Sequence, residues 1–115
     1  MTNYPKVSII TVVYNGIEFL EETIKSVIAQ TYPNIEYIIV DGGSKDGTLD
    51  IIKKYEAHIS KWISEPDKGI YDAMNKGIDL ATGDWQNFLN AGDSFVDNNV
   101  LEKIFTTNLE NITLV

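Results

Sequence analysis

Apolar and polar residues alternate along this chain with two distinct periods. Residues 7–13 form an almost unbroken β-branched run, which is typical of a strand buried on both faces of a sheet. Apolar residues then recur at i, i+4, i+7 and i+8, the spacing of one face of an α-helix: Leu20, Ile24, Val27 and Ile28. The same alternation predicts strands at 35–40, 62–63, 85–89 and 112–115 and helices at 49–55, 70–81 and 98–107. Strands alternating with helices predict an α/β fold, a parallel sheet with flanking crossover helices.

Length and composition narrow the class of protein. The chain of 115 residues suffices for one domain, residues 1–115, with a real hydrophobic core, since 43% of the residues are apolar. The 9 basic and 17 acidic side chains give a net charge of −8, which argues against binding nucleic acid. No cysteine is present, so disulfides and thiolate metal sites are excluded, and a reducing cytoplasm suits the chain.

The two ends carry no sign of targeting. Residues 1–6 lack the pattern of a secretory signal peptide, and no apolar run approaches the roughly 18 residues that a membrane span needs. The sequence stops inside an apolar run without a cap, so we expect it to belong to something longer.

Polar residues follow each predicted strand, and in a parallel sheet these carboxyl-end loops meet at one edge, where ligands bind. The loops hold residues 11–15, 41–44, 65–69 and 90–93. Asp41 sits where a strand turns into a helix, so it is placed to touch a ligand, and the glycines beside it, Gly42 and Gly43, allow the backbone to approach closely.

Four carboxylates are therefore expected in one crevice: those of Asp41, Asp67, Asp72 and Asp93. They would repel one another unless a cation or ligand donors compensate. Magnesium and manganese favour oxygen ligands, often one or two carboxylates plus substrate phosphates, so the pattern predicts a metal–diphosphate site. Asp93, just past a strand end, is the best single metal ligand, and Lys68 can add positive charge against phosphate.

Several of these residues also have a structural interpretation. A polar side chain after a strand is often a helix or turn cap, and this alternative applies to Asp41, Ser44, Asp46 and Asp93. For Asp46 the cap is the favoured interpretation. Lys68 can instead pair with Asp67 on an exposed loop, and Tyr14 can either anchor a strand end or stack on a base.

The remaining chemistry-bearing side chains exclude more than they suggest. Trp62 and Trp85 are expected in the core, and His58 near a helix end is expected to be solvated. Without another histidine, a histidine-based triad or zinc site is unavailable. Neither G-x-G-x-x-G nor a P-loop motif occurs, so metal bridging remains the way to hold a diphosphate.

Five segments resemble a known family in order and spacing. Residues 7–15 (VSIITVVYN), 26–32 (SVIAQTY) and 40–48 (VDGGSKDGT) resemble the family 2 glycosyltransferases of the GT-A fold. Residues 65–78 (EPDKGIYDAMNKGI) are similar to a bacterial subgroup that builds surface polysaccharides. Residues 88–95 (FLNAGDSF) lie where the family carries its acidic metal-binding motif. The resemblance covers nearly the whole chain.

This resemblance implies a Rossmann-like GT-A fold and transfer of a sugar from a nucleotide-diphosphate donor, usually a UDP-sugar, to an acceptor hydroxyl with inversion. It implies that Asp41 contacts the base, and that Asp93 binds Mg²⁺ or Mn²⁺ against the donor diphosphate. The other residues expected at the nucleotide are Thr11, Tyr14, Asn15, Gly43, Asp67, Lys68 and Asp72. The acceptor would be a saccharide or lipid-linked saccharide, and the location cytoplasmic or peripheral at the inner face of the membrane.

The sequence departs from the family pattern at three positions. Asn90 and Gly92 stand where the family often has Asp, so metal binding would rest on Asp93, and Met74 replaces a common arginine. The family's general base is expected beyond Val115, so the resemblance is to the donor-binding portion. The alternative function is a nucleotide- and metal-binding module without turnover. A flavodoxin-like signalling domain also fits the alternation, but it needs a lysine after Leu89 that this sequence lacks.

Overall fold

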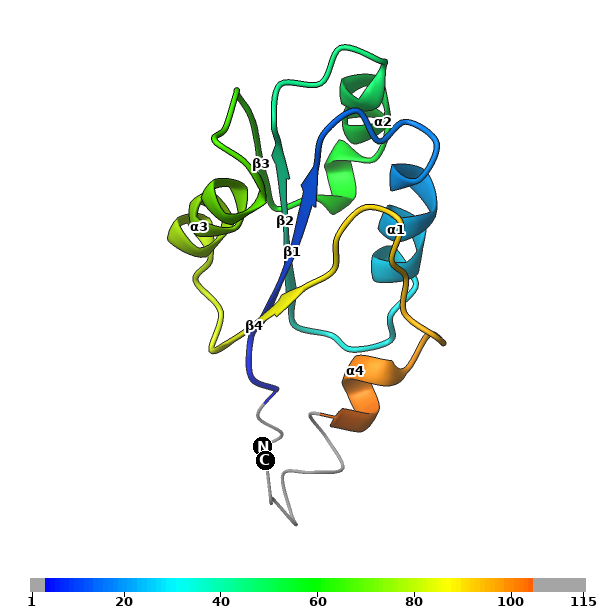
Figure 1. Ribbon diagram of the computed structural model, residues 1–115. Coiled ribbons are helices and arrows are strands. Elements are labelled where there is room, and N and C mark those ends of the chain that lie inside the picture. The colour runs from blue at the N-terminus through cyan, green and yellow to red at the C-terminus, as the bar shows by residue number, and fades with distance from the viewer. Residues whose placement is uncertain (1–3, 105–115) are drawn as a thin grey trace.

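A four-stranded parallel sheet lies between two layers of helices in the computed structural model, which describes residues 4–104. The strand order is β3-β2-β1-β4. The strands are β1 (Val7–Val13), β2 (Ile35–Asp41), β3 (Lys61–Ser64) and β4 (Trp85–Phe88). The helices are α1 (Leu20–Ile28), α2 (Thr48–Lys54), η1 (Glu56–His58), α3 (Ile70–Leu80) and α4 (Val100–Glu102). In Figure 1, α1 and α2 cover one face of the sheet and α3 covers the other.

The α/β fold expected from the sequence is confirmed. Every strand pairing is parallel, and each connection between successive strands contains a helix. The strand predicted at 7–13 has those bounds in the structure. The helix predicted at 98–107 corresponds to α4, which begins at Val100. The remainder of that predicted helix from residue 105, and the strand predicted at 112–115, lie outside the described residues.

The core divides into two clusters, one on each face of the sheet, because successive residues of a strand point to opposite faces. On the α1 and α2 face the largest fully buried residues include Ile9, Leu20, Ile24, Ile39 and Ile52. On the α3 face the buried residues are Ile10, Val12, Ile38, Val40 and Ala73. All seven residues of β1 are buried, as the continuous apolar run predicts.

A glycine sets how closely α3 approaches the sheet. A Cβ built on Gly77 would lie 2.4 Å from Cγ2 of Ile10 on β1, so only a residue without a side chain fits at this crossing. The helix prediction for residues 70–81 therefore gave the right element, and the small residue within it fixes the distance to β1.

The expectation that both tryptophans are core residues is wrong for Trp85, whose side chain is 44% exposed. Trp85 begins β4, which among residues 4–104 pairs only with β1 and exposes three of its four residues. Trp62 is partly buried and packs against the α1 and α2 cluster. His58 is exposed at the end of η1, as expected. Among residues 4–104, no helix has the length and apolar character that crossing a bilayer requires.

A buried carboxylate joins three strands to the turn before β4. Glu36 on β2 is 4% exposed, and its carboxylate accepts hydrogen bonds from Ser8 Oγ (2.8 Å) and from the backbone N–H of Thr82 (2.8 Å). Lys6 and Lys61 lie 3.4 and 3.3 Å from the same carboxylate. Burial raises the pKa of Glu36, but the hydrogen bonds from Thr82, Ser8 and Lys61 outweigh it and bring the pKa to about 2.

Candidate functional site

The loops at the carboxyl ends of the strands meet around one open pocket of about 490 Å³. Its walls come from the end of β1 and the following loop, the loop before α3, the start of α3 and the loop after β4. The lining residues are Val12, Val13, Tyr14, Asn15, Gly16, Phe19, Asp67, Gly69, Ile70, Ala73, Asn90 and Ala91. The sequence therefore predicted the correct edge of the sheet, and this volume suits a small-molecule ligand.

Asp41 lies behind the pocket. Its side chain is 0% exposed, and Oδ2 accepts hydrogen bonds from the N–H groups of Gly43 (3.0 Å) and Ser44 (2.8 Å) and from Ser64 Oγ (2.8 Å). Oδ1 accepts a fourth, from Ser44 Oγ (2.5 Å). Through these four bonds Asp41 fixes the conformation of the loop that follows it and ties that loop to the end of β3. Its expected contact with a base stays a prediction, and Asp41 is not among the lining residues.

The loop after β1 is locked to the loop after β2. The backbone N–H of Asn15 donates to Ser44 Oγ (2.7 Å), and Asn15 Oδ1 accepts from the N–H of Lys45 (2.9 Å). Asn15 has φ 49° and Gly43 has φ 89°, both in the left-handed region that Asn and Gly tolerate best. Ser44 thus braces these two loops and does not cap α2.

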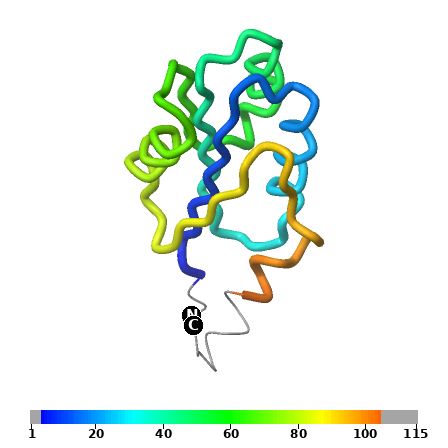
Figure 2. The backbone as a smooth tube through the Cα atoms, in the orientation of Figure 1, coloured from blue at the N-terminus to red at the C-terminus, as the bar shows by residue number. Residues whose placement is uncertain are grey.

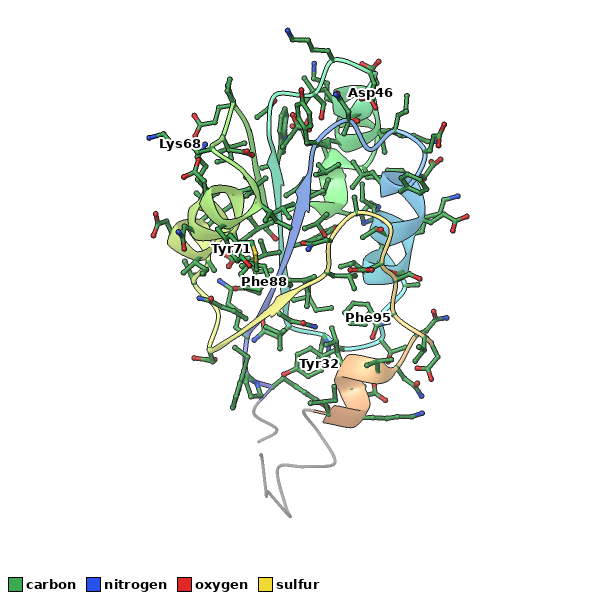
Figure 3. The ribbon with its side chains drawn as sticks, viewed as in Figure 1. Tyr32, Asp46, Lys68, Tyr71, Phe88 and Phe95 are labelled. Carbon is green, nitrogen blue, oxygen red and sulfur yellow. The ribbon has the colours of Figure 1, made fainter. Side chains whose placement is uncertain are left out.

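Gly47 occupies the N-cap position of α2, and the favoured cap residue, Asp46, lies directly before it and bonds the first residue of the helix from there. Asp46 Oδ1 accepts hydrogen bonds from the N–H (3.0 Å) and the hydroxyl (2.5 Å) of Thr48, the first residue of α2. Its Oδ2 accepts from the N–H of Ile17 (3.2 Å). The Thr48 hydroxyl lowers the pKa of the Asp46 carboxyl. Figure 3 shows Asp46 beside α2, and Asp46 does not line the pocket.

Tyr14 and Asp67 stand on either side of Gly42. A Cβ on Gly42 would lie 2.6 Å from Asp67 Oδ2 and 3.4 Å from Tyr14 Cδ1. The Tyr14 side chain is 63% exposed, so one aromatic face is available at the pocket. Asp67 is half-buried, and its Oδ1 accepts a hydrogen bond from the N–H of Gly69 (3.0 Å). Its other oxygen, Oδ2, lies beside Gly42. This pair offers a ring for stacking and a carboxylate oxygen for a donor group.

The residues that follow Asp67 turn outward. Asp72 accepts a hydrogen bond from the N–H of Lys68 (2.9 Å), which lowers the pKa of the Asp72 carboxyl, and it also lies 3.6 Å from Lys76 Nζ. Neither Lys68 nor Asp72 lines the pocket, and Lys68 is exposed at the periphery (Figure 3). Lys68 does not ion-pair with Asp67, and among residues 4–104 no lysine, arginine or histidine lines the pocket.

Thr11 is part of the core. It is 0% exposed, its hydroxyl donates to the carbonyl of Leu89 (2.6 Å), and it shares a hydrogen bond with Tyr37 Oη (2.9 Å). Its side chain therefore holds β1 to β2 and to the end of β4, outside the pocket.

The expected crevice of four carboxylates does not form. Of Asp41, Asp67, Asp72 and Asp93, only Asp67 lines the pocket, and residues 4–104 contain no group of three or more His, Cys, Asp or Glu side chains placed to hold a metal. The Asp41 carboxylate is bound by N–H groups of its own loop, and the Asp72 carboxylate by the N–H of Lys68 in the loop before α3. The Asp93 carboxylate is exposed on the turn after β4.

Asp93 is exposed on the turn after β4. The turn is closed by a hydrogen bond from the N–H of Asp93 to the carbonyl of Asn90 (2.9 Å), with Gly92 at φ 99°. No described residue contacts the carboxylate of Asp93 by hydrogen bond or ion pair. One carboxylate completed by phosphate oxygens and waters is a coordination that Mg²⁺ and Mn²⁺ accept, so the donor set is compatible with a metal although no cluster is present.

Asn90 lines the pocket, although it was not among the residues expected at the nucleotide or the metal. Its Oδ1 is buried and has no hydrogen-bond partner among the described residues. A buried acceptor without a donor is uncommon because it costs about 1–3 kcal/mol. A ligand that brings an N–H or O–H group would satisfy it. Its position immediately after a buried strand residue, Leu89, was the available signal.

The chain belongs to glycosyl transferase family 2, which it matches over residues 8–111. It has the parallel sheet with flanking helices of the GT-A glycosyltransferases. Two relatives show how close the likeness is. A glycosyltransferase of Mycobacterium tuberculosis is 47% identical over 96 residues, which are 83% of this chain and 37% of that protein. TuaG of Bacillus subtilis, named for teichuronic acid biosynthesis, is 40% identical over 99 residues, which are 83% of this chain and 39% of TuaG. The chain thus spans about two fifths of the length of these relatives.

Two solved structures share the fold. Staphylococcus aureus TarS, in complex with UDP-GlcNAc, has a TM-score of 0.82 at 24% identity, over 91% of this chain and 31% of the TarS chain. The mannosyltransferase PcManGT of Pyrobaculum calidifontis, in complex with GDP-Man and Mn²⁺, has a TM-score of 0.77 at 25% identity, over 84% of this chain and 30% of that chain.

Proposed function

We propose that this chain forms the donor-binding part of a glycosyltransferase that transfers a sugar from a UDP-sugar to an acceptor hydroxyl, with inversion, in bacterial polysaccharide synthesis. The observation that carries the proposal is a pocket at the carboxyl edge of the sheet where an exposed aromatic ring, a carboxylate and an unpaired acceptor line one cavity: Tyr14, Asp67 and Asn90. The nucleotide-sugar complexes of TarS and PcManGT, and the naming of TuaG, support it.

Each pocket residue has a role that its chemistry permits. The base stacks on the exposed face of Tyr14, because a π-face accepts any base without hydrogen-bond geometry. Asp67 Oδ2 and Asn90 Oδ1 are acceptors, so they take N–H or O–H donors of the nucleoside. The loops after β1 and β2 are held in shape by Asn15, Gly43 and Asp41. Asp41 acts on the base indirectly, by fixing the conformation of the loop after β2.

Charge is the second requirement, because a diphosphate brings negative charge to a pocket whose described lining holds a carboxylate and no cation. Asp93 would hold Mg²⁺ or Mn²⁺ as the single protein ligand. A divalent cation supplies charge neutralisation on the departing nucleotide diphosphate. Lys68 is exposed and is a second source of positive charge, although its charge also interacts with the Asp72 carboxylate, which accepts a hydrogen bond from the Lys68 backbone N–H. Thr11 supports the pocket from the core.

A second candidate function is donor binding without turnover. The observation that favours it is that this chain spans only 37–39% of the length of the two relatives named above. The two candidates are separated by a donor assay: the chain is incubated with UDP-GlcNAc and Mn²⁺, and release of UDP is followed over hours. With water as the only acceptor, hydrolysis of UDP-GlcNAc to UDP and free GlcNAc above the uncatalysed rate supports a chain that can cleave the donor. UDP binding in a separate titration without such hydrolysis supports the binding module.

Isothermal titration calorimetry tests donor binding itself. UDP is titrated into the 115-residue chain with and without Mn²⁺, and GDP serves as the comparison nucleotide. Asp93→Ala is expected to weaken UDP binding in the presence of Mn²⁺ by about tenfold or more, because the only protein ligand is lost. Asp79→Ala, an exposed acid on α3 outside the pocket, is the matched control and should bind as the wild type does. Absence of any UDP binding by the wild type would overturn the proposal.

A further inference from the structure

One face of α1 is polar, and it holds the loop that follows β4. Thr23 and Ser26 lie three residues apart on α1, the spacing of a single helix face, and Gln30 follows just after the C-cap Ala29. Each bonds to the backbone of residues 92–101. Figure 2 shows this segment, coloured yellow to orange, running alongside α1. The three side chains therefore form a polar ladder between a helix and a loop that shares no regular pairing with it.

The second and third rungs hold the far part of the loop. Ser26 Oγ accepts a hydrogen bond from the N–H of Phe95 (3.3 Å). Gln30 Nε2 donates to the carbonyl of Asp97 (2.6 Å), and Gln30 Oε1 accepts from the N–H of Leu101 (3.2 Å). Gln30 is 8% exposed, so these bonds are shielded from water.

The first rung acts on the candidate metal ligand. Thr23 is 0% exposed, and its hydroxyl accepts a hydrogen bond from the N–H of Gly92 (3.0 Å) while donating to the carbonyl of Asp93 (2.7 Å). The carbonyl of Phe19, at 3.4 Å, is a weaker alternative for the same proton. One buried hydroxyl thus fixes the chain on both sides of the Asp93 α-carbon.

We propose that Thr23 is the positioning residue of the metal site: by holding the backbone of Gly92 and Asp93, it aims the Asp93 carboxylate. No described residue makes a hydrogen bond or ion pair with that carboxylate, so the backbone position sets the direction of the Cα–Cβ bond and the set of rotamers that can reach a metal. Gly92 has φ 99°. Because glycine adopts many backbone conformations, the hydrogen bonds with Thr23 restrict the conformation of this turn. This inference rests on the proposed role of Asp93.

Three variants of the 115-residue chain test it. Thr23→Val keeps the shape of the side chain and removes the hydroxyl, Thr23→Ser restores the hydroxyl, and Ile24→Val is a matched control that trims the core face of the same helix. Mn²⁺ binding is measured by electron paramagnetic resonance at saturating UDP, and UDP binding without metal is measured by calorimetry. Thr23→Ala is the fallback should the valine variant fail to fold, because water can enter the smaller site and satisfy the Gly92 N–H and Asp93 carbonyl.

The expected result is a split between the two measurements. Thr23→Val weakens Mn²⁺ binding by about tenfold, the size of effect typical of residues that orient a metal ligand, and leaves metal-free UDP binding unchanged. Thr23→Ser and Ile24→Val stay within about twofold of the wild type. The inference is overturned if Thr23→Val binds Mn²⁺ as the wild type does while Asp93→Ala does not. It is also overturned if Thr23→Val and Ile24→Val weaken both ligands alike, which marks a general structural effect. Wild-type Mn²⁺ affinity in Asp93→Ala instead overturns the proposed metal ligand itself.

Discussion

Gly42 lies directly against Asp67: a Cβ on the glycine would come within 2.6 Å of Asp67 Oδ2. The two residues belong to different loops, one after β2 and one before α3. The same Cβ would lie 3.4 Å from Tyr14 Cδ1. The absence of a side chain at position 42 is what allows the aromatic ring and the carboxylate to face one pocket. The glycine therefore serves the geometry of its neighbours.

Gly42→Ala is expected to push the Asp67 carboxylate aside and to weaken UDP binding by about tenfold, or ~1.4 kcal/mol. Calorimetry with a double-mutant cycle checks the cause. In an Asp67→Ala background the clash is gone, so the same glycine substitution should have little further effect. Equal losses in both backgrounds would show that Gly42 acts through its backbone and not through Asp67.

Asn90→Leu removes the unpaired acceptor from the pocket wall. Free of a ligand, the variant is expected to be more stable than the wild type by about 1 kcal/mol, because a buried polar atom without a partner is replaced by an apolar one of similar size. UDP binding should weaken at the same time. Urea denaturation measures the stability and calorimetry measures UDP binding. A gain in stability together with a loss of UDP affinity would support Oδ1 as a ligand contact. A variant that is less stable, or that binds UDP normally, would argue that Oδ1 is not a ligand contact.

Glu36→Gln is expected to remove a pH-dependent part of the stability. The pKa of Glu36 is about 2 in the folded chain against 4.5 for an unperturbed glutamate, so the unfolded chain binds the proton more readily. The resulting stability, about 3 kcal/mol, is present above pH 4.5 and is lost as the pH falls through 4.5 towards 2. Urea denaturation from pH 7 to pH 2 should show the wild type losing this margin and Glu36→Gln, already destabilised at pH 7, losing less. Glu22→Gln, at an exposed position on α1, should change stability by less than ~0.5 kcal/mol. Parallel curves for wild type and Glu36→Gln would contradict the role of the buried cluster.

The sign of the stability change in Gly77→Ala distinguishes helix propensity from the packing of α3 against β1. Alanine in place of glycine stabilises a helix by about 0.5–1 kcal/mol in isolation. At this position the new Cβ would meet Ile10 Cγ2 at 2.4 Å, and overpacking costs about 1–3 kcal/mol, so we expect net destabilisation. Asp79→Ala, exposed on the same helix, should show the stabilising effect of propensity alone. Thermal unfolding of both variants decides the matter, and a stabilised Gly77→Ala would mean that α3 can move away from β1.

Within residues 4–104 the sequence by itself determined the strands and the α-helices, though not η1, together with their parallel arrangement and the edge of the sheet that carries the pocket. These follow from period and alternation: a β-branched run such as 7–13 has few alternatives, and the carboxyl ends of parallel strands meet wherever the strands run. The contact of Asp46 with the start of α2 was also predictable, because it depends on backbone groups two residues away.

Only the tertiary structure decided which acids line the pocket. Asp41 is turned inward by bonds to its own loop and to Ser64, 23 residues later on β3, and Thr11 is withdrawn by bonds to Tyr37 and Leu89. Trp85 is exposed on β4, which among residues 4–104 pairs only with β1, and Thr23 meets Asp93 across 70 residues of sequence. A hydrophobic pattern records which face of an element is buried. It does not record which partner a polar side chain finds, since that depends on where distant backbone groups come to lie once the sheet has formed.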